Sequence, residues 1–265
     1  MQEQDIDYNP TQMRFGGIAR LMTPKVLDKL FNSHVLIVGI GGVGSWVAES
    51  LARSGIGKLT LVDLDDICIT NTNRQLHAMS STIGKPKVEV MRDRIFDIAP
   101  EIEVRAILDF FNQSTANEIL DDNYSVIIDC IDSLDNKCLL IDLVRKNKTP
   151  LITIGGAGGK LDPSLIRTGD LNQTSNDTLL KRVRRTLKYD YHYERGLKTL
   201  WGVQAVYSIE RAKYVNEQGE IEFVPDEKNR GLSCATGIGT ASWLTGSFGF
   251  TASALAIQTI TKDVH

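Results

Sequence analysis

The sequence of 265 residues has few cysteines, and their spacing argues against two kinds of site. The four cysteines are scattered, and no two of them form a C-x-x-C pair: Cys68, Cys130, Cys138 and Cys234. Paired cysteines typically hold structural zinc, and closely spaced cysteines form the disulfide framework of small secreted domains. We therefore expect no zinc, and we expect reduced thiols as in a cytoplasmic protein.

A targeting segment and an excess of positive charge are also missing. The first residues, MQEQDIDYNPTQMRFGG, are polar and acidic, and they lack the basic start and apolar run of a secretory signal. The net charge is −3, which does not indicate a general affinity for nucleic acid. We expect a cytoplasmic protein in which any contact with nucleic acid is local.

One long stretch, residues 231–261, lacks charge altogether. Its 31 residues are enough for a membrane span, but ten of them are Ser or Thr and five are Gly. This composition is much less hydrophobic than that of a typical span. We favour a buried, small-residue helix packed in the core or against another subunit, with membrane association as the minor alternative.

The chain shows no repeat, no low-complexity tract and no clear linker, which predicts one continuous fold over residues 1–265. We expect a nucleotide-binding half at about 30–150 and a substrate-binding half at about 151–265. In the first half, apolar runs and helical periodicity predict strands within 35–38, 58–66, 103–108 and 124–132 and helices at 43–54 and 85–98. This alternation is typical of a doubly wound, Rossmann-like α/β sheet.

The second half has a different pattern. Short apolar runs separated by turns and polar loops predict strands within 151–160, 164–171, 202–208 and 220–226. Because no long helices are evident between them, we expect antiparallel additions that extend the same sheet.

A glycine-rich turn, GIGGVG, separates the first predicted strand from the first predicted helix. Its glycines permit a tight turn and a close approach of backbone N–H groups to phosphates: Gly39, Gly41, Gly42 and Gly44. Asp63 ends the next predicted strand, at the position where a carboxylate accepts hydrogen bonds from ribose hydroxyls. Asp65 is close enough to share this role, so the turn and the two acids predict a nucleotide site.

The run TNTNRQ follows the second strand and indicates which nucleotide is bound. It supplies four polar side chains, and a fifth stands near the start of the next helix: Asn71, Asn73, Arg74, Gln75 and Lys87. The glycine turn alone would suit the NAD site of a dehydrogenase, but a hydride-transfer enzyme has little use for so many donors. Attack on the α-phosphate of ATP develops charge that Arg and Lys stabilise. The asparagines alone also fit turn capping.

Two aspartates follow the apolar strand within 124–132, in the sequence DCID. The carboxyl end of this strand should open onto the same crevice, where a carboxylate can hold Mg²⁺ against ATP oxygens. For Asp132 we prefer this role, while Asp129 fits a strand-end hydrogen bond equally well. These features together predict adenylation of a carboxylate.

The motifs GIGGVG, DLDD, TNTNRQ, GKPKVE and DCID, in this order, resemble the superfamily of ubiquitin-activating enzymes and the molybdopterin- and thiamin-pathway adenylyltransferases. This resemblance implies an ATP-dependent adenylation fold, usually as a homodimer. By position it implies that Asp63 and Asp65 bind ribose, that Asn71, Arg74 and Lys87 bind the phosphates, and that Asp132 binds magnesium.

The resemblance also implies that an arginine near the start reaches the ATP site of the neighbouring subunit. Both Arg14 and Arg20 fit that position, and we favour Arg20. Each is equally consistent with a helix-surface arginine.

Three further motifs, RFGGIARLM, GGAGGKLDP and LSCATGIGTA, are similar to those of the bacterial tRNA threonylcarbamoyladenosine dehydratases, and they extend the resemblance over nearly the whole chain. It implies ATP-driven activation of the threonyl carboxylate of N6-threonylcarbamoyladenosine, next to the anticodon, followed by ring closure. A sulfur-transfer partner such as a cysteine desulfurase stays open. Cys234 could be a nucleophile or only a small buried residue. Because ring closure needs no enzyme thioester, we favour the buried residue.

Two alternatives remain. An enzyme that activates the C-terminus of a ubiquitin-like sulfur-carrier protein would be expected to carry the zinc cysteines, and a non-catalytic nucleotide-binding module would be expected to lack part of the phosphate-binding residues. The sequence meets neither expectation.

A tRNA substrate requires a local basic surface, and residues 181–198 supply one. This segment holds seven Lys or Arg against two acids, a local charge of +5. We expect four of its cations to contact the tRNA: Arg182, Arg184, Arg185 and Lys188. Tyr189, Tyr191, His192 and Tyr193 interleave with the charges, as in surfaces that stack bases. A solvated helix followed by a polar loop is the alternative.

Overall fold

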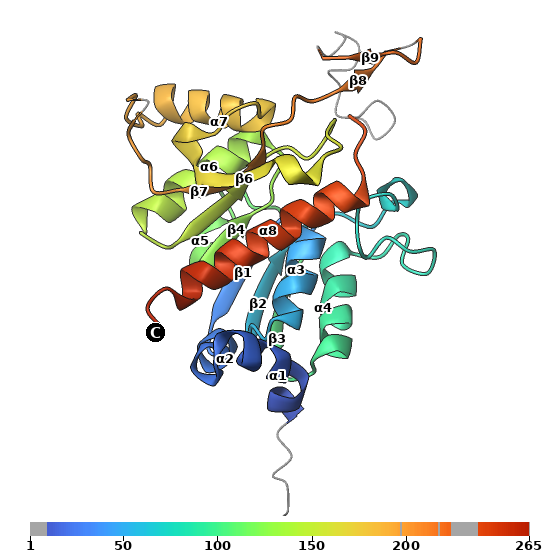
Figure 1. Cartoon of the computed structure of the whole chain (residues 1–265), viewed down its shortest axis with the longest axis vertical. Coiled ribbons are helices and arrows are strands. Elements are labelled where there is room, and N and C mark those ends of the chain that lie inside the picture. The colour runs from blue at the N-terminus through green and yellow to red at the C-terminus, as the bar shows by residue number, and fades with distance from the viewer. Residues whose placement is uncertain (1–9, 197, 217, 224–237, 265) are drawn as a thin grey trace, which may run out of the picture.

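The structure is a computed structural model that describes residues 10–196, 198–216, 218–223 and 238–264 (Figure 1). Its centre is a seven-stranded sheet with the order β3-β2-β1-β4-β5-β7-β6, and β8 and β9 form a separate pair. The strands are β1 (His34–Val38), β2 (Lys58–Val62), β3 (Glu103–Ile107), β4 (Val126–Asp129), β5 (Leu151–Ile154), β6 (Ile166–Asp170), β7 (Gln204–Ser208), β8 (Tyr214–Val215) and β9 (Ile221–Glu222).

Helices cover both faces of the sheet (Figure 1). The α-helices are α1 (Pro10–Met22), α2 (Pro24–Phe31), α3 (Gly44–Arg53), α4 (Lys87–Ile98), α5 (Ala116–Leu120), α6 (Leu134–Lys146), α7 (Thr178–Tyr189) and α8 (Ser242–Thr261). Three short 3-10 turns are η1 (Ile69–Asn71), η2 (Pro163–Leu165) and η3 (Leu171–Gln173).

The first half matches the predicted doubly wound unit. β1 runs parallel to β2 on one side and to β4 on the other, and the predicted helices at 43–54 and 85–98 are α3 and α4. The strand order reverses between β1 and β4, and in open α/β sheets this reversal produces the ligand crevice at the carboxyl ends of the strands. The glycine turn and the acidic strand ends therefore meet at one edge of the sheet.

The second half extends the same sheet, with one difference from the expectation. β6 is antiparallel to β7, as predicted, but β7 is parallel to β5. The reason is α7, which returns the chain to the end of the sheet where β5 begins. Among the described residues 220–223 of the last predicted strand, Ile221–Glu222 form β9, which pairs with β8 outside the main sheet.

The central strands are buried on both faces, as a doubly wound sheet requires. Val35 and Ile37 pack with α3, α4 and α8, and Leu36 and Val38 pack on the opposite face with α6 and α7. Full burial of one such side chain contributes about 1.5–3 kcal/mol. The two cores fix the crevice from both sides.

Within the uncharged stretch, Ser242–Thr261 form α8, and the expectation of a buried, small-residue helix is confirmed for these residues. α8 crosses one face of the sheet (Figure 1) and buries Leu244, Phe248 and Ala252. At Gly249 an added Cβ would lie 2.7 Å from the Cβ of Trp46, so glycine permits the close approach of α8 to α3. Among the helices that the structure describes, none combines the length and hydropathy needed to cross a bilayer.

Candidate active site

The glycine turn packs directly against the end of β4. Gly39 has a φ of +92°, and an added Cβ there would lie 2.9 Å from the carbonyl oxygen of Cys130. At Gly44 a Cβ would lie 1.9 Å from the carbonyl oxygen of Gly39, so no other residue fits without movement of the backbone. Gly41 and Gly42 lie between these two positions, against Gln75 and Arg74. The turn therefore places the first amides of α3 at the crevice, where they can face phosphate groups.

Asp63 holds the glycine turn in place through hydrogen bonds. Its Oδ2 accepts a hydrogen bond of 2.7 Å from the Ile40 N–H, and its Oδ1 accepts one of 2.9 Å from the Asp65 N–H. Burial raises the pKa of Asp63, while Lys87, whose Nζ lies 3.5 Å from Oδ1, and the two N–H groups oppose the rise. Both oxygens are engaged within the chain.

Asp65 and Lys87 are close to each other but differ in exposure. The Lys87 Nζ lies 2.6 Å from Oδ2 of Asp65, and Lys87 is buried at the start of α4 while 57% of the Asp65 side chain is exposed. The ammonium group therefore bridges Asp63 and Asp65 at the mouth of the crevice. Of the two acids, Asp65 has the oxygens that a ribose can reach.

In the polar run after β2, some side chains are fully engaged within the chain and others keep donors for a ligand. Asn71 is buried, and its Oδ1 accepts a hydrogen bond of 3.0 Å from the Cys68 N–H, which is the turn-capping role. The Asn73 Nδ2 donates to the carbonyl of Thr240 at 2.8 Å. Arg74 donates through one terminal nitrogen to the Thr70 carbonyl and to Asn73 Oδ1, at 2.7 and 3.1 Å. A guanidinium has five N–H donors, so Arg74 retains donors for a ligand.

Two residues that the sequence did not single out hold the backbone of Arg74. The Trp46 Nε1 on α3 and the Thr245 Oγ1 on α8 donate to the carbonyl oxygen of Arg74, at 3.1 and 3.0 Å. Because α3 and α8 are far apart in sequence, only the folded chain brings these donors together.

Gln75 and His77 are buried behind the glycine turn. The His77 Nε2 lies 2.8 Å from the carbonyl oxygen of Ile40 and must donate to it, which leaves Nδ1 as an acceptor. Neither this Nδ1 nor the Gln75 Oε1 has a partner among the described residues. Burial lowers the pKa of His77 to about 4, so the ring is neutral near pH 7. Sequence reasoning missed His77, although it lies two residues after the run TNTNRQ.

The two aspartates at the end of β4 have different environments. Asp129 is fully buried: its Oδ2 lies 2.9 Å from the Nζ of Lys137 and accepts a hydrogen bond of 2.6 Å from Thr153. Its Oδ1 accepts one of 3.1 Å from the Ile131 N–H. The structure thus gives Asp129 the strand-end role, and it reveals Lys137, a buried lysine on α6 that the sequence did not indicate.

Asp132, by contrast, is exposed beside the crevice and makes no hydrogen bond or ion pair with the described residues. No group of three or more His, Cys, Asp or Glu in the described part of the chain could hold a metal by itself. Mg²⁺ bound with a nucleotide needs only one or two protein carboxylates, because phosphate oxygens and water complete its shell. The position of Asp132 suits that arrangement.

The two candidate arginines of α1 lie away from the crevice. α1 packs beside α2, near the start of β2, at the opposite end of the sheet (Figure 1). Arg14 donates to the Ile98 carbonyl at 3.0 Å and lies 3.4 Å from Glu101. Arg20 is exposed and has no hydrogen bond or ion pair with the described residues. Neither reaches the glycine turn of its own chain.

The basic segment forms α7 and the loop after it. Arg182 and Arg185 are exposed, but Arg184 is half-buried and donates to Thr174 Oγ1. The Nζ of Lys188 lies 5.4 Å from the centre of the Trp201 ring, a cation–π distance.

The aromatic residues of this segment do not all face solvent. Tyr189 is exposed, but Tyr193 is buried and packs edge-on against Trp201. The expectation that Tyr193 stacks bases is wrong, because its ring belongs to the core beneath α7. The predicted Cys234 lies outside the described residues.

Comparison with known proteins places this geometry in a family. The model of the ThiF family matches residues 16–262. The chain is 44% identical to the tRNA threonylcarbamoyladenosine dehydratase of Haemophilus influenzae over 251 residues, covering 95% of this chain and 94% of that protein.

Solved structures show the same likeness. The structure of the Escherichia coli tRNA N6-threonylcarbamoyladenosine dehydratase in complex with ATP has a TM-score of 0.85 and 41% identity, covering 95% of each chain. A structure of the same enzyme with AMP is equally similar in coverage. The sulfur carrier protein ThiS adenylyltransferase of E. coli is 35% identical, but it covers only 51% of this chain and 54% of its own length.

Proposed function

This chain belongs to the ThiF family, and from this premise we propose that it catalyses the ATP-dependent dehydration of N6-threonylcarbamoyladenosine in tRNA, next to the anticodon. The observation that carries the proposal is the extent of the similarity. The dehydratases of H. influenzae and E. coli match 95% and 93% of the chain, including the half that follows β5, whereas the sulfur-carrier adenylyltransferase matches about half of it. We assign substrate binding to this second half, so the match there favours a tRNA substrate.

The reaction has two steps. An oxygen of the threonyl carboxylate attacks the α-phosphorus of ATP, and pyrophosphate leaves. A nucleophilic atom of the carbamoyl group then attacks the activated acyl carbon, loses its proton and displaces AMP, which carries away the carboxylate oxygen. The sum is the loss of one water from the nucleoside and the conversion of ATP to AMP and pyrophosphate.

The crevice supplies the charges that the first step requires. We assign Arg74 and Lys87 to the phosphate oxygens, where negative charge accumulates during attack, and Asp65 to the ribose hydroxyls, with Asp63 holding the turn beneath it. The amides after Gly41 and Gly42 face the phosphates, and Asn71 and Asn73 keep the arginine loop in place. Removal of one such charge typically costs about 10²–10³ in kcat.

Magnesium belongs to this proposal. Asp132 would hold the ion, which neutralises phosphate charge when it is bound with ATP. Asp129 is unsuited to this role because Lys137 and Thr153 occupy its Oδ2 and Ile131 its Oδ1.

A homodimer completes the site in this proposal. Arg20 is exposed on α1 and lies too far from its own crevice, so the ATP site it would reach is that of a second copy. Arg14 is engaged by Ile98 and Glu101 within its own chain, which supports the choice of Arg20. Arg20→Ala should lower turnover and leave the circular dichroism spectrum unchanged; mixing it with Asp132→Asn protein should restore part of the activity.

The direct test uses tRNA that carries N6-threonylcarbamoyladenosine. Incubation with the protein, ATP and Mg²⁺ should convert the nucleoside to a form lighter by one water, as seen by nucleoside mass spectrometry, with AMP formed in equal amount. A reaction that proceeds without a cysteine desulfurase would also show that no sulfur-transfer partner is required. AMP formation that depends on a ubiquitin-like protein with a Gly-Gly end, and not on tRNA, would favour the sulfur-carrier alternative.

The RNA surface is tested separately. Arg182→Glu with Arg185→Glu should weaken tRNA binding and reduce the slope of log affinity against log salt by about 2, because each lost phosphate contact releases fewer counterions. Arg184 is left intact because it supports Thr174. The matched control is Lys29→Glu with Arg92→Glu, two exposed residues on α2 and α4. ATP binding should be unchanged in both variants, and equal tRNA affinities would exclude α7 from the RNA surface.

A further inference from the structure

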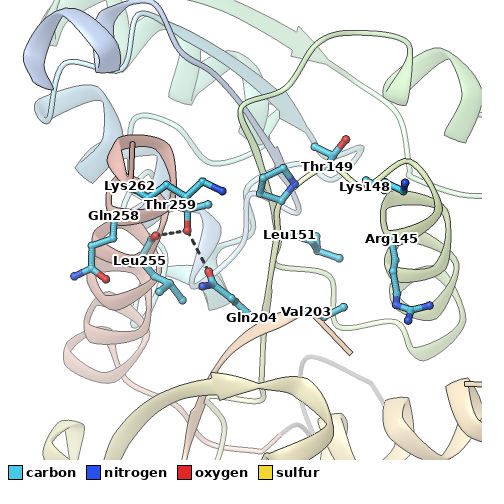
Figure 2. Close-up of a pocket in the computed structure, with 12 residues that line it drawn as sticks. Arg145, Lys148, Thr149, Leu151, Val203, Gln204, Leu255, Gln258, Thr259 and Lys262 are labelled. Atoms are coloured by element: carbon cyan, nitrogen blue, oxygen red, sulfur yellow. Dashed lines mark hydrogen bonds between the residues drawn. The ribbon is translucent and has the colours of Figure 1, made fainter. Parts of the chain in front are cut away.

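A second hollow lies at the edge of the sheet opposite the crevice. It has a volume of about 420 Å³ and is lined by the first residues of β5 and β7 and by the last turns of α6 and α8. Figure 2 shows Thr259 of α8 and Lys262, just after that helix, across from Arg145 of α6 and Lys148, just after it. Leu151 lies between the two sides. The parallel strands β1, β4, β5 and β7 all begin at this edge, so the hollow is separate from the nucleotide site by the length of the strands.

The charge of this hollow is strongly positive. Of the twelve described residues that line it, three are cations, Arg145, Lys148 and Lys262, and none is acidic. Two helices have their C-terminal ends there, and each end carries about half a negative charge. Together the two helix ends offset about one of the three positive charges. An excess of about two positive charges remains, which indicates an anionic ligand.

The polar groups of the hollow are held in place. The Arg145 Nε donates to the Trp201 carbonyl at 3.0 Å. Lys148 has a φ of +59°, a left-handed conformation that lysine rarely adopts, at the turn after α6. The Thr259 hydroxyl lies 3.2 Å from the Gln204 Oε1, as the dashed line in Figure 2 shows. The hollow thus combines a hydrogen-bonded guanidinium and two exposed lysines with amide donors, which suits phosphate oxygens.

A chain of cation–aromatic contacts connects the hollow to α7. The Arg145 guanidinium lies 4.7 Å from the centre of the Tyr193 ring, and Tyr193 packs edge-on against Trp201. The Nζ of Lys188 on α7 lies 5.4 Å from the centre of the Trp201 ring. Two buried rings, Tyr193 and Trp201, therefore lie between a cation of the hollow and a cation of α7 and hold the two in a fixed relation.

The direction of α7 shows that this helix runs from the crevice side of the sheet to the side of the hollow. Its N-cap, Asp177, accepts a hydrogen bond of 2.9 Å from the Gly156 N–H, on the crevice side of β5, and its last turn lies beside Trp201 at the opposite edge. A helix of twelve residues spans about 18 Å, roughly the depth of the sheet. The exposed cations of α7 therefore form a path from the crevice to the hollow.

We propose that this hollow binds a backbone phosphate of the tRNA, at the far end of the path along α7. The proposal rests on the tRNA substrate proposed above. None of the lining residues is aromatic, so a nucleobase would find no ring on which to stack, while a phosphate finds two lysines, a guanidinium and the Thr149 hydroxyl. The RNA is thus held at two places, and the distal one positions the molecule without taking part in the chemistry.

The test removes the two exposed lysines and leaves Arg145, which supports Tyr193. Lys148→Glu with Lys262→Glu should weaken tRNA binding about tenfold at moderate salt and reduce the salt slope by one to two. The KM for tRNA should rise, while kcat at saturating tRNA and the affinity for ATP stay unchanged. Lys148→Gln with Lys262→Gln should act in the same direction with a smaller effect, and Lys29→Glu with Arg92→Glu is the charge-matched control.

Each outcome decides the proposal. A tRNA affinity equal to that of the charge-matched control would overturn it, and a continued effect of Arg182→Glu with Arg185→Glu would then leave the tRNA substrate standing. Failure of the wild-type protein to bind tRNA at all would overturn the proposed function as well. If inorganic phosphate raises the Tm of the wild type but not of the lysine variants, and tRNA affinity is unaffected, the hollow is a site for free anions and the proposal is wrong.

Discussion

Two lysine–aspartate pairs flank the crevice, and they differ in the exposure of the acid. On the β4 side, Lys137 and Asp129 are both fully buried, and Thr153 and a backbone N–H also bind the carboxylate. On the β2 side, Lys87 is buried, but 57% of the Asp65 side chain is exposed. We refer to them as the closed pair and the open pair.

The difference shows how one edge of a sheet provides both scaffold and site. The closed pair has no polar group left for a ligand, and it holds the loop that presents Asp132 to the crevice. The open pair can exchange partners, because Lys87 can contact a phosphate while Asp63 retains its nearby charge. A buried pair that exchanged partners would leave one charge uncompensated at a cost of several kcal/mol. The same two residue types therefore serve different purposes according to solvent access.

The largest expected effect comes from breaking the closed pair. Lys137→Met should lower the free energy of unfolding by about 3–5 kcal/mol, because it leaves the Asp129 carboxylate buried without its counter-charge. Urea denaturation followed by circular dichroism measures the loss. The double variant Lys137→Met, Asp129→Asn should recover part of the stability, and a single variant as stable as wild type would contradict the closed-pair assignment.

Removing charge from the open crevice should affect catalysis and spare the fold. Arg74→Ala and Asp132→Asn should each lower kcat for AMP formation by about 10²–10³, because each removes charge stabilisation that develops as the α-phosphate is attacked. The Tm should stay within about 2 °C of wild type, since both residues are at least partly exposed. Near-wild-type turnover in either variant would remove that residue from the site.

The buried ring behind the glycine turn should make stability dependent on pH. Burial lowers the pKa of His77 to about 4 from the ordinary 6.5, so between these values the unfolded chain binds a proton that the folded chain does not. The stability that neutral His77 contributes is fully present above pH 6.5 and is lost as the pH falls to about 4. The free energy of unfolding should fall by about 3 kcal/mol in total over this range. Urea midpoints from pH 7 to 4 measure this slope.

His77→Gln supplies the control for that measurement. The glutamine amide N–H can still donate toward the Ile40 carbonyl, but the side chain does not titrate. The slope of the free energy of unfolding against pH, between pH 6.5 and 4, should therefore be smaller by the part that His77 supplies. An unchanged slope would show that His77 is not the titrating group.

The smallest effect is expected from the exposed acid of the open pair. Asp65→Asn should change the free energy of unfolding by less than about 1 kcal/mol, because the Asp65 carboxylate is largely exposed to water and Lys87 keeps Asp63 as its partner. The KM for ATP should still rise about tenfold, since a hydrogen bond from a ribose hydroxyl to a charged acceptor is lost. A KM equal to that of wild type would shift ribose binding to another residue.

Much of the site could be predicted because its parts follow one another locally along the chain. A glycine turn between a strand and a helix, and acids at the ends of β2 and β4, are local features, and parallel strands bring such ends to one edge. The partners of those residues could not be predicted. Lys137 on α6 appears in the sequence as one more helix lysine, and only its packing under β4 makes it the counter-charge of Asp129.

The sequence by itself determined the order of strands and helices in the first half, the ATP-type turn at Gly39–Gly44 and the uncharged helix near the end, because hydrophobic periodicity and glycine spacing act over a few residues. Tertiary structure decided which of Asp129 and Asp132 is free, that Tyr193 is a core residue, that β7 runs parallel to β5, and that Arg145, Lys148 and Lys262 line one hollow. Those outcomes depend on burial, and burial depends on contacts between segments that are distant in the chain.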